Sequence, residues 1–424
     1  MKYLAIILVA VLAILIVVFI SWFLNMKANG KCPLCALKKI FIPTKLTIDI
    51  SEDEEYSENK VAQTPPMGWS SWNTFRNNID QDIIMQTAHA MKDSGLANAG
   101  YEFINLDDCW QSSLRDSDGK LQGDLGTFSR GIPKLIKDIN ALDLKVGLYS
   151  SNGTLTCEDL PASLGNERLD AKTIASWGCE FFKYDFCHHN RISGDCPAIE
   201  HIVITKPKSA FEIDLRPEDA EFTGRAKIIK MSDVPSKKAI GFISHGSGSA
   251  SFNFDADEKG EYVLTFVFHK SMAKKKQYMQ IHINGKMYEI FFPETKGFSP
   301  LGRQQIIVEL KEGTNNMTIK NPVATAIDSS YIQYKRMGDA LKEASSMWAK
   351  VTHSEEKPIT YSICEWGMAR PYLWGAKAGS MWRTTPDIAP NWRSITMIYN
   401  RTLKLYKHSG PGHWNDPDML EVGN

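Results

Sequence analysis

The feature that most constrains the fold is an alternation that recurs along most of the chain. An apolar run typical of a β-strand ends in polar or acidic residues and is followed by helical periodicity. After the first run, for example, Ile84, Ala88 and Met91 recur at the spacing of a helix face. Continuous alternation of this kind predicts a parallel sheet with right-handed crossovers, covered by amphipathic helices. The seven runs begin at Met67, Tyr101, Lys145, Cys179, Pro358, Ser380 and His413.

Chemically active side chains at the ends of these runs favour one α/β architecture, the (β/α)₈ or TIM barrel. A doubly wound sheet is the alternative. Its dinucleotide-binding version is disfavoured because no GxGxxG turn follows the first strand. Only seven strand runs precede Asn424, so we expect a barrel truncated after its seventh strand.

Between residues 201 and 334 the alternation stops. Short runs with period two, such as EYVLTFVF and QYMQIHING, are separated by turns rich in Gly, Asn and Lys, which predicts an inserted all-β sandwich domain. Helical periodicity then resumes, so the insert interrupts the barrel without ending it. We expect the first part of the barrel at residues 64–200 and the second, incomplete part at residues 335–424.

The N-terminal segment has a different composition. Tyr3 to Leu24 carries no charge and is long enough to cross a bilayer as one helix, so residues 1–25 are interpreted as a transmembrane anchor or a signal segment. An uncleaved anchor is favoured, because no small-residue cleavage pattern follows closely. Residues 26–63 are expected to form a solvated juxtamembrane linker, which includes the acidic run SEDEEYSENK from Ser51 to Lys60. Lysines after the segment place the body in the cytoplasm by the positive-inside rule: Lys27, Lys31, Lys38 and Lys39.

The overall charge excludes one class of partner. Lys plus Arg equals Asp plus Glu at 49 each, so no electrostatic argument favours nucleic acid, and a neutral partner is expected. The ends of the strand runs, in contrast, are rich in carboxylates. Each acid alone is more often a solvated loop residue or a helix cap, but several converging on one mouth need a cationic or polyhydroxyl ligand. The charged residues at these ends are Asp107, Asp108, Lys183, Asp185, Glu365, Arg383, Asp387, Asp416 and Asp418.

Two ligand classes fit such a mouth, a metal or a sugar. Cys179, Cys187, His188, His189 and Cys196 lie near the fourth strand, yet they form neither a CxxC nor an HxxxH pair, which disfavours a zinc site. An oxygen-rich divalent site remains open. Tryptophans beside the acids favour a sugar, and we expect no cofactor and no metal; they are Trp72, Trp110, Trp382 and Trp414.

Eight ordered stretches resemble the melibiase-type α-galactosidases, glycoside hydrolase family 27. They are TPPMGWSSWNTF, INLDDCWQ, RDSDGKLQGD, GLYSSNGTLTC, FFKYDFC, YSICEWG, WRTTPDI and GHWNDPDMLEVGN. The resemblance covers about residues 64–195 and 334–424. It implies a (β/α)₈ barrel that releases terminal α-linked galactose with retention of configuration.

The resemblance also implies roles for individual residues. Asp185 in the KYD stretch would be the nucleophile, and Asp387 at the end of WRTTPD would be the acid/base. Cys157 would pair with Cys187 in a disulfide. The substrate-binding residues would be Trp72, which stacks on the sugar, Asp107 and Asp108 at O4 and O6, Lys183 at O3 and O4, Glu365 and Arg383 at O2, and Tyr149 and Asp418 in the same pocket.

Physical chemistry sets demands on the two proposed catalytic acids. Retention requires carboxyl groups about 5 to 5.5 Å apart, one ionised beneath the anomeric carbon and one protonated beside the leaving oxygen. Lys183 lies two residues from Asp185 on a strand, so it faces the same side and should keep that carboxylate ionised. Asp387 must hold a proton, which requires burial or the negative charge of Asp185 and Asp418.

The predicted function is therefore that of a retaining glycoside hydrolase acting on an α-galactoside oligosaccharide or glycoconjugate. The alternatives are an α-N-acetylgalactosaminidase, a β-L-arabinopyranosidase, or a non-catalytic sugar-binding surface protein. The insert resembles carbohydrate-binding modules in PEDAEFTG, HINGK and KEGTNNMTIKN, and a purely bracing role is equally open. The catalytic domain is expected outside the cytoplasm, secreted or membrane-anchored, in conflict with the lysine bias.

Overall fold

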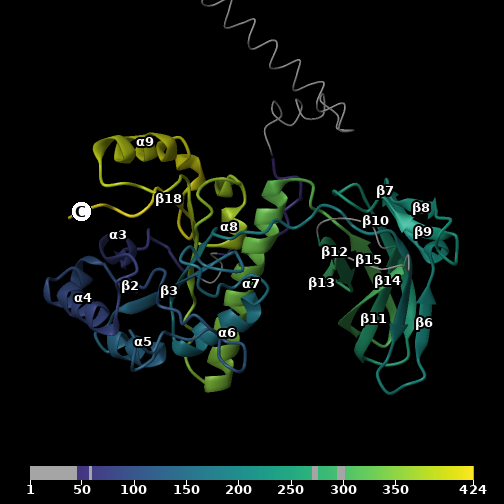
Figure 1. The fold of residues 1–424 in the computed structure, drawn as a ribbon, viewed down its shortest axis with the longest axis horizontal. Helices are drawn as coiled ribbons and strands as arrows, with labels where there is room; N and C mark the ends of the chain where they lie inside the picture. Colours follow the sequence, from purple (N-terminus) through teal and green to yellow (C-terminus); the bar gives the residue numbers. More distant parts are fainter. Residues whose placement is uncertain (1–44, 57–59, 270–275, 294–300, 424) are drawn as a thin grey trace, which may run out of the picture. The chain divides into compact units, whose positions relative to one another are not determined.

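The computed structural model describes residues 45–56, 60–269, 276–293 and 301–423. Seven parallel strands form one curled sheet in the order β1-β2-β3-β4-β16-β17-β18 (Figure 1). Each strand pairs with the next one of this kind along the chain, as in a (β/α)₈ barrel, which confirms the predicted fold class and all seven predicted strand runs. The strands are β1 (Gly68–Ser70), β2 (Phe103–Asn105), β3 (Lys145–Ser151), β4 (Phe181–Asp185), β16 (Thr360–Ile363), β17 (Met381–Arg383) and β18 (Trp414–Asp416).

Helices connect the parallel strands, and their sequences explain where they begin. In α4 the carboxylate of Asp80 caps the first turn by accepting a hydrogen bond from the backbone N–H of Ile83 at 2.8 Å. The predicted face of Ile84, Ala88 and Met91 is buried. The helices of this part are α3 (Trp72–Phe75), α4 (Gln81–Asp93), α5 (Ile132–Asn140), α6 (Glu167–Trp177), α7 (Ala326–Thr352), α8 (Gly375–Ala378) and α9 (Trp392–Leu403).

The inserted segment between β4 and α7 is antiparallel throughout. One sheet has the order β13-β12-β15-β10-β7 and the other β14-β11-β5-β9-β8, with β6 paired to β5, and their inward side chains form a hydrophobic core of their own. The strands are β5 (Ile199–Thr205), β6 (Glu212–Leu215), β7 (Glu221–Gly224), β8 (Lys227–Lys230), β9 (Lys238–Gly241), β10 (Gly248–Ala256), β11 (Gly260–His269), β12 (Gln277–Ile283), β13 (Lys286–Phe292), β14 (Leu301–Leu310) and β15 (Gly313–Lys320).

The helix that follows the insert begins earlier than the sequence analysis expected. Thr325 and Asp328 form a reciprocal capping box, and α7 starts at Ala326, inside the range that was given to the sandwich. Every residue from 327 to 334 is buried. Four of these buried residues are polar, so the apolar periodicity by which a helix face is recognised in a sequence is interrupted.

The acidic run before the barrel is not a purely solvated linker. Tyr56 is 2% exposed, and its hydroxyl donates a hydrogen bond to the carbonyl of Ile359 at 2.8 Å. Thr47 donates hydrogen bonds from its backbone N–H and its hydroxyl to the carboxylate of Asp328, at 2.7 and 2.8 Å. The acidic residues around Tyr56 led to the prediction that this segment is solvated. For Tyr56, whose side chain is buried, that prediction is wrong.

The membrane prediction concerns Tyr3–Leu24, which lies outside the described residues. Among the residues that the structure does describe, no helix has the length and apolar composition needed to span a bilayer.

A substitution at Gly338 of α7 can test how closely this helix packs against α8. A Cβ at this position would lie 2.1 Å from the carbonyl oxygen of Ala378. Alanine favours helices over glycine by about 1 kcal/mol, yet the backbone clash should outweigh this gain. We expect Gly338→Ala to lower the free energy of unfolding by about 1–3 kcal/mol in urea titrations. Ser346→Ala, in the same helix, should change it by less than about 0.5 kcal/mol. Unchanged or increased stability of Gly338→Ala would contradict this packing.

Candidate active site

A polar cavity of about 110 Å³ lies where the parallel strands end. Asp185 is the last residue of β4 and Arg383 the last of β17. The aspartates of the INLDD stretch follow the end of β2 after one intervening residue. Parallel strands present their carboxyl ends on one side of a sheet, which is why residues far apart in sequence meet here. Of the predicted catalytic and binding residues, all but Glu365 line the cavity: Trp72, Asp107, Asp108, Tyr149, Lys183, Asp185, Arg383, Asp387 and Asp418.

Lys183 joins two of the carboxylates. Its ammonium lies 2.7 Å from a carboxylate oxygen of Asp107 and 4.0 Å from one of Asp185. The second carboxylate oxygen of Asp185 accepts a hydrogen bond from the backbone N–H of Phe186 at 2.8 Å. Burial opposes the charge of Lys183, but the carboxylates of Asp107 and Asp185 raise the pKa of Lys183 overall.

Asp185 is buried, and burial raises the pKa of its carboxyl group above the usual value. The charge of Lys183 opposes this effect in part, as the sequence analysis expected. The closer partner of Lys183, however, is Asp107. Keeping Asp185 ionised therefore depends on a lysine that it shares with a second carboxylate.

Asp108 is 1% exposed and held by the backbone. Its two carboxylate oxygens accept hydrogen bonds from the N–H of Cys109 at 2.8 Å and of Glu158 at 3.0 Å. Burial raises the pKa of Asp108 to about 6, and these hydrogen bonds limit the rise.

Asp387 lacks one of the two surroundings predicted for a general acid, namely burial. Its side chain is 76% exposed, and one carboxylate oxygen lies 2.8 Å from the guanidinium of Arg383. The same guanidinium nitrogen lies 2.9 Å from the carboxylate of Asp418. Burial is absent because this aspartate lies in a loop beyond β17. The other predicted condition, the nearby negative charge of Asp185 and Asp418, stays a prediction.

Asp418 is more rigidly placed. Its carboxylate accepts hydrogen bonds from the backbone N–H groups of Ile388 and Met419, both at 2.8 Å. Its φ of 84° lies in the left-handed region, which non-glycine residues rarely adopt. The loop of Asp387 is thereby tied to the loop that follows β18.

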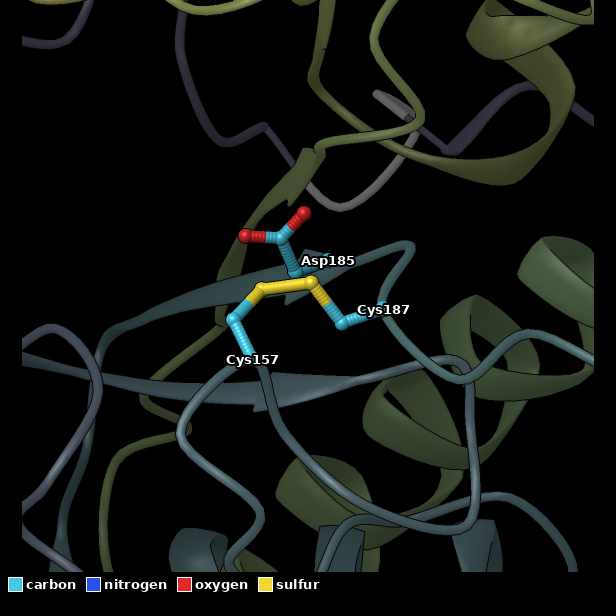
Figure 2. A group of neighbouring side chains, drawn as sticks. All are labelled: Cys157, Asp185 and Cys187. Atoms are coloured by element: carbon cyan, nitrogen blue, oxygen red, sulfur yellow. A yellow bond between two sulfur atoms is a disulfide. The ribbon is translucent and has the colours of Figure 1, made fainter.

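A disulfide joins Cys157 to Cys187, as the family resemblance implied. Figure 2 shows this bridge beside the carboxylate of Asp185, and Cys157 lines the cavity. Among the described residues, Cys157, Asp185 and Cys187 are the one group of three potential metal ligands whose atoms converge. Because both sulfur atoms are joined to each other, this group is not a preformed metal site.

Glu365 is completely buried and does not line the cavity. One carboxylate oxygen accepts a hydrogen bond from the backbone N–H of Ala369 at 2.5 Å, and the other is buried with no hydrogen-bond partner within the described structure. Burial raises the pKa of Glu365 to about 8. Its predicted contact with a sugar hydroxyl would require an opening toward the cavity.

Five further residues line the cavity that the sequence analysis did not select. Arg76 lies over the ring of Trp72, with its guanidinium carbon 5.6 Å from the ring centroid. The sequence could have indicated Trp366 as a cavity residue, because it directly follows the selected Glu365 in the YSICEWG stretch. The five residues are Asn73, Arg76, Trp366, Ile388 and Met419.

The matching family model is described as alpha galactosidase A, and it covers residues 64–201 and 325–424. The chain therefore belongs to this family of carbohydrate-active proteins. The residues between the two matched ranges hold most of the antiparallel insert.

Several similar proteins are described as alpha-galactosidases. An alpha-galactosidase of Cyamopsis tetragonoloba is 30% identical over 369 residues, which are 87% of this chain and 54% of that protein. Alpha-galactosidase A of Cellvibrio japonicus is 28% identical, over 86% of this chain and 56% of that protein. The crystal structure of alpha-galactosidase I from Mortierella vinacea matches with a TM-score of 0.50 and 25% identity, over 86% of this chain and 61% of that one. The chain thus spans little more than half the length of these curated relatives.

The titration of Asp108 tests the electrostatics of the cavity. We expect its carboxyl group to titrate near pH 6 by ¹³C NMR of aspartate-labelled protein, because burial is the main cause of the raised pKa. Asp107→Asn should lower this value only slightly, since the charge of Asp107 is the smallest contribution. Titration of Asp108 near pH 4 in the folded protein would contradict the buried placement.

Proposed function

We propose that the protein is a retaining glycoside hydrolase that releases terminal α-linked galactose. The main support is that Asp185 and Asp387 line one cavity together with ordered groups able to bind hydroxyls. Family membership supports the same reaction, and because the chain spans only part of its relatives, the activity is proposed for the protein that contains it.

Asp185 acts as the nucleophile in this proposal. It attacks the anomeric carbon, the bond to the leaving oxygen breaks, and a covalent glycosyl-enzyme forms. Its position is supported from two sides, by the N–H of Phe186 on the carboxylate and by the hydroxyl of Tyr334, which donates to the backbone carbonyl of Asp185 at 2.9 Å. The raised pKa favours nucleophilicity, while Lys183 preserves the ionised form.

Asp387 acts as acid and then as base. A bound sugar would exclude water from this exposed carboxyl and supply the burial that the empty cavity lacks. Arg383 is already held by Asp418 and would bind the 2-hydroxyl, so its contact with Asp387 would weaken as substrate enters. Asp387 can then give a proton to the leaving oxygen and later accept one from water.

The other side chains of the cavity give the substrate preference. Asp107 and Asp108 accept hydrogen bonds from O4 and O6, Lys183 donates to O3 and O4, Arg383 donates to O2, and Trp72 and Tyr149 provide ring surfaces. Glu365 would reach O2 only if the cavity opens toward it. The ring of Tyr149 is oriented by its hydroxyl, 3.2 Å from the sulfur of Cys157, and by the ammonium of Lys183, 5.2 Å from its centroid. These hydrogen-bond donors, acceptors and ring surfaces together suit galactose.

The nearest alternatives are an α-N-acetylgalactosaminidase and a β-L-arabinopyranosidase. An N-acetyl group would need extra room on the O2 side, where the large side chain of Glu365 lies buried behind the cavity lining. The Asp107–Asp108 pair suits a substrate with a C6 hydroxymethyl group. A non-catalytic sugar-binding protein would have no need for both Asp185 and Asp387. A sugar-binding role for the sandwich remains a proposal of its own.

The location proposed is outside the cytoplasm. The Cys157–Cys187 disulfide supports an oxidising compartment, since such bonds are rare in the reducing cytosol. Attachment to a membrane through Tyr3–Leu24 stays a prediction.

The roles of the two acids can be separated by azide rescue. We expect Asp185→Ala and Asp387→Ala each to lower kcat on an aryl α-galactoside by several orders of magnitude. Azide should rescue Asp185→Ala to give the β-galactosyl azide, because it attacks directly from the face opposite the leaving group. It should rescue Asp387→Ala to give the α-azide, because it attacks the glycosyl-enzyme.

Asp118→Asn is the matched control, since this aspartate is exposed and pairs with Lys120 away from the cavity. It should retain full activity. Near-normal turnover by either alanine variant, or the same azide configuration from both, would refute the assignment.

Selectivity at C4 tests the sugar contacts. An aryl α-glucoside, which inverts the C4 hydroxyl, should leave the carboxylate of Asp107 without its donor, at a cost of about 1–3 kcal/mol. We therefore expect a kcat/KM roughly ten- to a hundredfold lower than for the aryl α-galactoside. A preference for the glucoside would show that Asp107 and Asp108 do not hold the C4 side, even if the azide experiments succeed.

A further inference from the structure

A second cavity, of about 710 Å³, lies at the other ends of the parallel strands. The C-terminal ends of α5, α6 and α7 line it, together with the segments 178–180 and 354–358 that lead into β4 and β16. It therefore opens where these strands begin, whereas Asp185 stands where β4 ends. None of its lining residues belongs to the candidate active site.

Two indole rings border this cavity. Trp348 on α7 is 41% exposed, and Trp177 at the end of α6 is half-buried and held edge-on by Trp110, with ring centroids 6.0 Å apart. A single exposed tryptophan is ordinary, but two that border one cavity offer flat apolar surfaces of the kind that the C–H faces of sugar rings cover.

Polar groups of the cavity are held in place by one another. The ammonium of Lys357 donates to Asn140 at 3.1 Å and to Glu180 at 3.2 Å. The hydroxyl of Ser345 donates to Glu356 at 2.9 Å. Donors and acceptors from separate segments are thus arranged before any ligand arrives, as in a preformed binding site.

The charge of the lining selects the class of ligand. Lys357 is matched by Glu180 at hydrogen-bond distance, and the remaining lining includes Lys137, Glu355 and Glu356, so neither sign dominates. A polyanion or a polycation gains little here. A neutral ligand with many hydroxyl groups can use the paired donors and acceptors as well as the two indoles.

We propose that this cavity is a second saccharide-binding site, which takes a neutral oligosaccharide remote from the bond that is cleaved. The indoles carry the ring faces, and the Lys357–Asn140–Glu180 group binds hydroxyls. That this oligosaccharide carries galactose rests on the proposed function. The stacking and hydrogen-bonding groups that define the cavity do not depend on that function. A long or multivalent substrate would remain bound through this site between cleavage events.

Residue-specific NMR can test this site separately from the active site. In protein labelled with 5-fluorotryptophan, each indole gives a ¹⁹F signal, which single Trp→Phe variants assign. Raffinose is the probe, and Asp185→Asn prevents its turnover. We expect saturable shifts of Trp348 and Trp177 in addition to Trp72, which reports the active site. Trp392, 77% exposed on α9, should not shift and is the internal control.

Lys357→Met should weaken the Trp348 response at least about tenfold and leave the Trp72 response unchanged, because it removes a charged hydrogen-bond donor. Lys350→Met, an exposed lysine on α7 outside the cavity lining, should change neither. If Trp348 does not shift up to the solubility limit of raffinose, or shifts equally in Lys357→Met, the second site is refuted. If Trp348 shifts but the intact protein cleaves no aryl α-galactoside, the second site stands and the proposed function fails.

Discussion

The ion pair between Lys183 and Asp107 is the interaction on which the candidate active site depends. Asp107, Asp108 and Asp185 are all buried around it, and three carboxylates so placed would repel one another and favour protonation. The ammonium of Lys183, 2.7 Å from Asp107 and 4.0 Å from Asp185, offsets part of that repulsion. Because the two acids share one buried cation, the ionisation of Asp185 depends on what Asp107 binds, and a sugar hydroxyl on Asp107 would leave more of the electrostatic attraction of Lys183 to Asp185.

Arg383 is likewise shared between two carboxylates of the cavity, those of Asp387 and Asp418. It contacts Asp418, which backbone N–H groups hold in a strained loop, and Asp387, which is exposed. One partner is thus buried and held by backbone N–H groups, whereas the other is exposed to solvent. This asymmetry suits an acid/base residue, whose surroundings must change when substrate displaces water.

Helix α7 connects the insert to this chemistry. The hydroxyl of Tyr334 holds the backbone of Asp185, and two residues further along α7 the guanidinium of Arg336 forms two hydrogen bonds with Glu289 of β13. The N-terminal residues of α7 are buried on all sides, so the helix has little freedom to shift. The match to the family model stops near the start of the insert and resumes near its end. The helix that follows the insert therefore belongs to the matched part, and it also supports the proposed nucleophile.

The sequence alone determined the parallel architecture and most of the site, because strand runs that end in acids are local patterns and parallel strands bring such ends together. It also indicated the pairing of Cys157 with Cys187 through the family resemblance. Tertiary structure decided what no local pattern contains. The exposure of Asp387, the seclusion of Glu365 from the cavity, the burial of Tyr56 among acidic neighbours and the early start of α7 all depend on which distant segments cover a residue. Burial, and with it the ionisation of each carboxyl group, is a property of the packed chain and not of its sequence neighbours.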